Sequence, residues 1–119
     1  MAHIFHIERE GHGGDPQPIS LPEWTEVVAR VEGVRMAHGD ACAINPLTED
    51  RIVIPNRGGD VELFRPDCQQ WMRALWWTPE GTVRFAAPAT DEDPVVQTAK
   101  VLAAQLEARV VDDDGRVYN

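Results

Sequence analysis

Lysine and serine are nearly absent from this chain. Lys100 is its only lysine and Ser20 its only serine, and the 11 basic residues are outnumbered by 20 acidic ones, for a net charge of −9. Proteins that bind nucleic acids draw most of their affinity from neutralising phosphates, so this balance argues against DNA or RNA as a ligand. Anionic membrane surfaces are disfavoured for the same reason. The acidic charge would attract a basic protein partner, and the alternative is that it simply keeps a small domain soluble.

Other features that the chain lacks exclude further classes of protein. No apolar run is long enough to cross a bilayer, and the N-terminal residues lack the basic flank and apolar stretch of a signal peptide. Cys42 and Cys68 form no disulfide-rich pattern, so we expect free thiols in the cytoplasm. Nucleophilic serine and Schiff-base lysine chemistry are disfavoured, because Ser20 is predicted to cap a helix and Lys100 to face outward from one.

Two segments of the chain have the pattern of amphipathic helices. The first follows Ser20-Leu21-Pro22-Glu23, a capping box in which the serine and the glutamate satisfy each other's free amides, and Gly33 is expected to end it. The second begins at Asp93-Pro94, an N-cap followed by proline at the first helical position. Its apolar residues recur at helical spacing and include small alanines, which predicts close packing on a sheet. They are Val95, Ala99, Leu102, Ala103 and Leu106.

Between the two helices the apolar residues alternate with period two. This pattern predicts five strands, and a first strand over 3–9 and a short one after the turn at 112–115 complete the set. The five strands are expected near 37–44, 51–55, 60–65, 70–77 and 82–87. Their short connections imply an antiparallel meander. We therefore predict a single α+β domain over residues 1–119, a two-layer sandwich with both helices on one face of the sheet.

The sheet face away from the helices is the predicted recognition surface. If a turn at 78–81 pairs Trp77 with Thr82, then Trp77 points to this open face and Trp76 points to the core. A loop one residue shorter would exchange the two faces. Tryptophan and arginine are enriched in binding hot spots. The predicted partner-binding residues are Trp71, Arg73, Trp77 and Arg84. The alternative is that the loop at 11–18 or a terminal segment covers these tryptophans.

His38, Asp40 and Cys42 support a second hypothesis, a small enzyme or metal-binding protein, because they would share one side of the 37–44 strand. His38 and Cys42 lie too far apart along a strand for direct contact, which favours Cys42 as a small core residue and His38 as a polar residue at the strand end. The Asp-rich run at 112–115 lacks the other ligands of a calcium loop and is predicted to be a turn. We therefore predict no metal, cofactor or catalytic residue.

Both ends of the chain resemble a group of small acidic bacterial proteins that are largely uncharacterised. The motifs that carry the resemblance are His6-Ile7-x-Arg9, Ile19-Ser20-Leu21-Pro22-Glu23-Trp24 and Ala104-x-Leu106-x-Ala108-Arg109-Val110-Val111-Asp112-Asp113-Asp114-Gly115-x-Val117-Tyr118. The chain departs from the group at Asp112 and Arg116, where a glycine and an acidic residue are usual. The group is similar in size and acidity to immunity proteins that neutralise bacterial toxins. The acidic balance and the face with tryptophan and arginine predict a non-enzymatic protein-binding module, and the resemblance suggests an immunity protein that neutralises a basic toxin. A homodimer joined through the open face is a further possibility.

Overall fold

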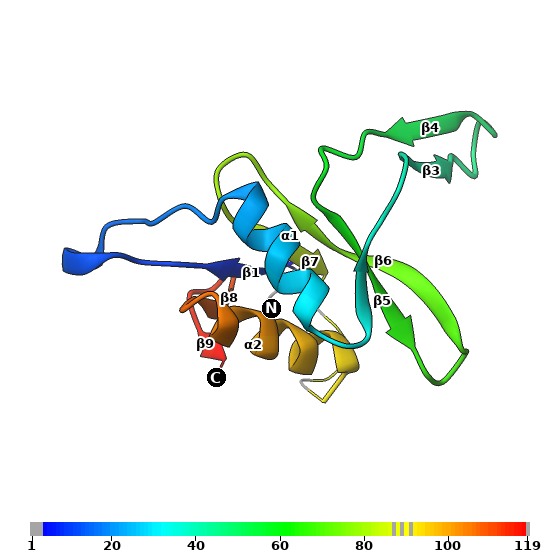
Figure 1. Ribbon diagram of the computed structural model, residues 1–119. Helices are drawn as coiled ribbons and strands as arrows, with labels where there is room; N and C mark the ends of the chain where they lie inside the picture. The colour runs from blue at the N-terminus through cyan, green and yellow to red at the C-terminus, as the bar shows by residue number, and fades with distance from the viewer. Residues whose placement is uncertain (1–3, 87, 89, 91, 119) are drawn as a thin grey trace.

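An antiparallel sheet with helices packed against it forms the computed structural model, which describes residues 4–86, 88, 90 and 92–118 (Figure 1). The helices are α1 (Leu21–Arg30) and α2 (Pro94–Gln105), and η1 (His12–Gly14) is a short 3-10 turn. The strands are β1 (Ile4–Glu8), β2 (Val34–Met36), β3 (Ala41–Ile44), β4 (Arg51–Ile54), β5 (Asp60–Arg65), β6 (Gln70–Trp77), β7 (Val83–Ala86), β8 (Arg109–Asp112) and β9 (Val117–Tyr118). The predicted α+β sandwich is confirmed; residues 3 and 87 of the predicted strands lie outside the described residues.

The order of the strands differs from the predicted meander. The main sheet has 7 strands in the order β2-β5-β6-β7-β1-β8-β9, so only β5, β6 and β7 follow one another as expected. The predicted 37–44 strand is interrupted at 37–40. Strands β3 and β4 pair with each other as a separate hairpin, which projects from the sheet in Figure 1. We name this hairpin, residues 41–54, the arm.

One apolar core joins the helices to the sheet. Phe5 pairs with Phe85 and Ile7 with Val83, and each of these side chains is at most 3% exposed. Trp24 of α1 belongs to the same buried cluster, as do several residues of α2. Both helices therefore pack on the sheet face that bears these strand residues. No helix of the described residues is both long and apolar enough to span a membrane.

Both helices begin where the sequence predicts. The Ser20 hydroxyl accepts a hydrogen bond from the Glu23 amide at 3.3 Å, and the Glu23 carboxylate accepts one from the Ser20 amide, which completes the capping box. Asp93 caps α2 by accepting a hydrogen bond from the Val95 amide at 2.9 Å. These caps satisfy amides that would otherwise have no partner in the first turn.

The loop between β6 and β7 decides which tryptophan faces the core. Trp77 pairs with Val83 and Trp76 with Arg84, so the loop spans 78–82 and is one residue longer than predicted. The predicted register is therefore wrong, because a slip of one residue exchanges the faces of a strand. Trp77 packs on the core, and its Nε1 donates a hydrogen bond to the Ile19 carbonyl at 2.9 Å. Trp76 takes the place predicted for Trp77 on the opposite face.

Gly81 in this loop allows a close approach of the segment that precedes α1. Its carbonyl accepts a hydrogen bond from the Ile19 amide at 2.9 Å, and its φ of +86° lies in the left-handed region. A Cβ atom at this position would lie 2.4 Å from Pro18 Cβ and 2.6 Å from Pro18 Cα. No real side chain tolerates such distances, so glycine is required here on two counts.

We predict that Gly81→Ala lowers the free energy of unfolding by about 3 kcal/mol, because it adds a backbone clash to the cost of a left-handed alanine. Gly115→Ala is the matched control: its φ is +87° but no atom lies within 4 Å of the added Cβ. This control should lose only about 1 kcal/mol. Urea unfolding of the two variants measures the difference, and equal losses would contradict the close contact with Pro18.

Candidate functional site

The sheet face that points away from the helices carries aromatic and charged side chains. Strand pairing places on it the neighbours of the buried residues Val61, Leu63 and Val83. We name this surface the far face; it comprises Arg35, Asp60, Glu62, Phe64, Trp71, Arg73, Trp76 and Arg84. Trp71, Arg73 and Arg84 thus lie on the predicted side, whereas the fourth predicted residue, Trp77, belongs to the core.

Trp71 is held in position by two neighbours. The Phe64 ring meets it edge-on, with 5.4 Å between ring centroids. The Arg35 guanidinium lies 4.2 Å from the centroid of the Trp71 ring, and its Nε donates to Glu62 at 2.9 Å. A tryptophan stacked under an arginine and left partly exposed presents a rigid apolar surface at little entropic cost.

Arg73 fixes the root of the arm. Its Nη1 donates to the Asp60 carboxylate at 2.9 Å, and its Nη2 donates to the carbonyls of His38 at 2.9 Å and Gly39 at 2.6 Å. The arginine was predicted to bind a partner, but these bonds inside the molecule engage its guanidinium, which is largely buried. Burial raises the pKa of the Asp60 carboxyl, although Arg73 acts to lower it.

Asn56 ties the other strand of the arm to the same place. The backbone amide of Asn56 donates to the Asp40 carboxylate at 2.9 Å, and its side-chain Nδ2 donates to the Ala37 carbonyl at 3.1 Å. Its Oδ1 in turn accepts hydrogen bonds from the amides of Gly58 and Asp60. The segment that leads into the arm and the segment that leaves it are thus hydrogen-bonded to each other and to β5. The arm therefore leaves the sheet in a defined direction.

A groove of about 510 Å³ lies where the arm root meets the far face. Its apolar lining includes Pro55, Trp76 and Pro79, and Arg57 and Arg84 add positive charge. The other lining residues are Ile54, Asp60, Trp77, Thr78 and Glu80. An apolar concave surface with a few charged groups is the usual form of a binding site. Its central aromatic, Trp76, was missed in the sequence because loop length, which sets the register, has no clear signal there.

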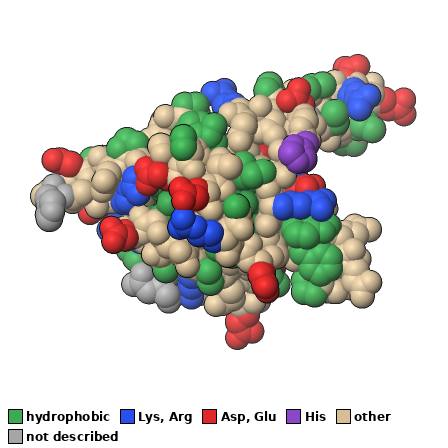
Figure 2. Space-filling model, in the orientation of Figure 1, with side chains coloured by type: hydrophobic (Ala, Val, Ile, Leu, Met, Phe, Trp, Pro, Cys, Tyr) green, Lys and Arg blue, Asp and Glu red, His purple; other side chains and the backbone are tan. Residues whose placement is uncertain are grey.

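The arm exposes large aliphatic side chains along its length. Leu47 at the tip is 92% exposed and Ile44 is 70% exposed, while Ile52, Val53 and Ile54 are about half exposed. Figure 2 shows hydrophobic side chains along this projection and both acidic and basic ones at its outer end. The alternation of these residues is that of a buried strand, which is why the sequence assigned them to the sheet.

The enzyme or metal hypothesis required His38, Asp40 and Cys42 on one side of a strand, and the structure does not provide that strand. The chain turns at Gly39, with a φ of +72°, to enter the arm. His38 and Cys42 are exposed, so the prediction that Cys42 is a core residue is wrong. The Asp40 carboxylate accepts the Asn56 amide and so stabilises the root instead.

The aspartates at 112–114 are the only group of three or more candidate metal ligands that lie close together among the described residues. Their arrangement is explained by the turn itself. The Asp112 carboxylate accepts the amides of Asp114 and Arg116 at 3.0 and 2.8 Å, and it also accepts the Tyr118 hydroxyl at 2.9 Å. These bonds hold β9 against β8, in agreement with the predicted turn.

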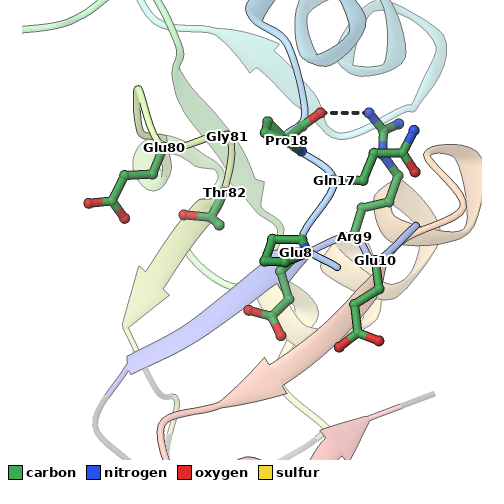
Figure 3. Close-up of a pocket in the computed structure, with 9 residues that line it drawn as sticks. Glu8, Arg9, Glu10, Gln17, Pro18, Glu80, Gly81 and Thr82 are labelled. Atoms are coloured by element: carbon green, nitrogen blue, oxygen red, sulfur yellow. Dashed lines mark hydrogen bonds between the residues drawn. The ribbon is translucent and has the colours of Figure 1, made fainter. Parts of the chain in front are cut away.

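A smaller pocket of about 90 Å³ lies between the end of β1 and the segments 16–18 and 80–82 (Figure 3). Arg9 donates to the Pro18 carbonyl at 2.7 Å, the bond drawn in Figure 3, and to both Glu23 oxygens at 2.7 and 3.1 Å. It also reaches the Leu106 carbonyl at the end of α2. Arg9 therefore joins the end of β1 to both helices. We interpret the pocket as a gap between these packed segments rather than as a ligand-binding site.

We predict that the Arg9–Glu23 pair contributes to stability at neutral pH and is lost in acid. The hydrogen bonds from Arg9, followed by those from Ser20, lower the pKa of Glu23 to about 2. A carboxyl with a lowered folded pKa adds stability above its unfolded pKa of about 4.3, and this is lost as the pH falls toward 2. Glu23→Gln removes this ionisation. The free energy of unfolding of the variant should therefore fall less than that of the wild type over the same pH range. Glu26→Gln, on the exposed side of α1, is the control, and identical acid unfolding of both variants would contradict this role.

We predict that Arg73→Met loosens the arm, because it leaves the Asp60 carboxylate buried without its cation, at a cost of about 3 kcal/mol. The pKa of Asp60 should then rise further, so the loss of stability should be larger at pH 7 than at pH 5. Hydrogen exchange should quicken first at the arm root. Arg84→Met is the control, since Arg84 is half exposed and lies 3.8 Å from Glu80. Adding Asp60→Asn should recover part of the loss.

Comparisons of the chain with protein-family models, with curated proteins and with solved structures found no match. Function is therefore inferred from the residues of the far face, the groove and the arm, together with the charge of the chain.

Proposed function

We propose that this protein is a non-enzymatic protein-binding module whose recognition surface is the far face with its groove. The observation that supports this most is the placement of Trp71 and Trp76, which lie partly exposed on the face away from the helices. Arg84 lies opposite Trp76 and is itself exposed. Aromatic anchors beside an arginine are the residues that most often dominate the binding energy of an interface.

The positions of the reactive side chains favour binding over catalysis. Ser20 serves as the cap of α1, and Lys100 lies half-buried on α2 rather than in the core. His38, Asp40 and Cys42 do not converge in the described structure, so the alternative of a small enzyme or metal-binding protein gains no support from their geometry.

The proposed partner is a basic protein, and the resemblance to small acidic bacterial proteins makes a bacterial toxin in the cytoplasm the leading candidate. A net charge of −9 attracts a basic partner over distance and accelerates encounter. Contact through Trp71, Trp76 and the groove would then block the partner's active site by occlusion. In this proposal the exposed Arg84 pairs with an acidic or carbonyl group of the partner, since Arg35 and Arg73 are engaged inside the molecule.

We predict that Trp71→Ala and Trp76→Ala each weaken the complex by about 2 kcal/mol or more while the protein remains folded. The measurement is affinity purification of the tagged chain from its source organism, followed by calorimetry with the recovered partner. Val101→Ala is the control, because Val101 is an exposed apolar residue on α2. Failure to recover any stoichiometric partner, or equal affinity of the Trp and Val101 variants, would contradict the proposal.

A further inference from the structure

We propose that two copies of this chain form a symmetric dimer in which the tip of each arm inserts into the groove at the root of the other arm. This goes beyond the proposed function and competes with it for the groove: when the partner copy's arm is seated on Trp76, recognition of a different protein is left to Trp71 and the rest of the far face. Each chain carries both parts of the contact: an apolar arm tip, and a groove at the arm root that can accept such a tip.

The arm needs a cover that the described part of the chain does not supply. Each of its strands pairs only with the other, which leaves two open edges, and an isolated hairpin is barely stable in water. Its five exposed aliphatic residues present on the order of 600 Å², the upper end of what a monomer usually leaves exposed. They are Ile44, Leu47, Ile52, Val53 and Ile54.

The tip is a preformed apolar knob with charged flanks. The Asn45 side chain accepts the Leu47 amide at 2.9 Å, and the Asn45 amide donates to the Asp50 carbonyl at 2.8 Å. The Glu49 amide closes the turn on the Asn45 carbonyl at 2.7 Å. Leu47 is almost fully exposed, and Glu49, Asp50 and Arg51 follow it in the chain, so the tip region carries two acidic groups and one basic group.

The groove at the root has the complementary composition. Pro55, Trp76 and Pro79 offer an apolar seat, and its volume of about 510 Å³ is more than a leucine side chain requires. Arg57 and Arg84 provide the cations for the two carboxylates of the tip. Two acids also line the groove: Asp60 is paired with Arg73, and Glu80 lies 3.8 Å from Arg84.

A second copy is the occupant that this arrangement favours. When two identical arms lie antiparallel about a two-fold axis, the same symmetry places the tip of each arm at the root of the other. The acidic tip then meets the basic root twice, and Ile52 and Ile54 of the two arms lie along the middle of the contact. Leu47, Ile52 and Ile54 of the two arms bring on the order of 700 Å² of apolar surface, and the groove surface that they cover adds to the area of the contact.

The net charge of the chain opposes this association but does not decide it. Charges farther apart than the Debye length, about 8 to 10 Å at physiological salt, are largely screened. The contact is governed by the groups within it, where Glu49 and Asp50 face Arg57 and Arg84. Moderate salt should therefore weaken the dimer less than replacement of Leu47 does.

Sedimentation equilibrium of the full chain tests the proposal. Wild type should have twice the mass of the chain at 50 µM, and Leu47→Asp should have the mass of a monomer with unchanged circular dichroism. The control is Val101→Asp, since Val101 on α2 is 49% exposed, like Ile52 and Ile54, and should remain dimeric. A monomeric wild type, or a dimer unaffected by Leu47→Asp, would overturn the proposal.

A charge exchange then tests the pairing of tip and root. Arg57→Glu should weaken the dimer at least tenfold, and adding Glu49→Arg to the same chain should restore most of the affinity. Absence of any restoration would overturn the proposed pairing. Trp71→Ala should leave the mass of the dimer unchanged, which separates this proposal from recognition of a different protein by the far face.

Cysteine labelling allows the contact to be located directly. Cys42 lies on β3 of the arm, whereas Cys68 lies in the turn between β5 and β6. Cys42 pairs with Val53 and therefore points away from Ile52 and Ile54, the side on which the arms meet. A Cys42→Ser, Cys68→Ser, Ile52→Cys chain labelled with pyrene should therefore show excimer emission. A Cys42→Ser chain labelled at Cys68 should show only monomer emission, and the reverse result would place the interface elsewhere.

Discussion

The ion pair between Arg73 and Asp60 is the contact on which the candidate surface of this protein depends. It joins β6 to the start of β5 and, through the carbonyls of His38 and Gly39, reaches the chain just before the arm. A buried carboxylate is unfavourable unless a cation and hydrogen bonds accompany it, and Arg73 supplies both. Since the groove lies between the arm and the far face, its shape is set by this contact. The arm is otherwise a lone hairpin that would sample many directions.

Arginine performs the same task at other points of the fold. Arg9 joins β1 to Glu23 of α1, and Arg65 makes two hydrogen bonds, of 2.7 and 3.1 Å, to Asp93 at the cap of α2. A planar guanidinium can bind a carboxylate and backbone carbonyls at once, which the single charge of a lysine does less well. The near absence of lysine is therefore consistent with cations that hold elements together. It leaves few basic groups free on the surface, and the chain is acidic overall.

The far face and the arm differ in rigidity and in how far their side chains are buried. The far face is rigid, because Trp71 is stacked under Arg35 and Trp76 lies within the central strands of the sheet. The arm is a small apolar structure whose own two strands do not bury its side chains. A rigid surface such as the far face suits recognition of a different molecule. An apolar hairpin such as the arm suits a permanent contact with another chain. The two proposals for this protein follow that division.

Local chemistry was sufficient for much of the fold to be read from the sequence. Ser20 and Asp93 cap their helices because their side chains reach amides only two or three residues away, and the Asp-Gly turn before β9 is equally local. Alternation likewise identified β5, β6 and β7. Alternation alone does not account for Trp71 and Arg73 lying on the face of Arg84, because it would align them with the buried Leu75; a β-bulge in the pairing of β5 with β6, between Val61 and Glu62, brings them to that face.

Only the tertiary structure decided the rest. The loop at 78–82 has five residues because Gly81 must meet Pro18 and Ile19, a contact between distant segments, and this length sends Trp77 inward and Trp76 outward. Residues 41–54 have the pattern of a buried strand pair, yet β5 pairs with β2 and β6, so the predicted place beside β5 is taken. The sequence by itself determined where the helices begin and which segments form the central strands, since those depend on near neighbours. Which faces are covered depends on contacts between segments far apart in the chain, and only the folded structure contains them.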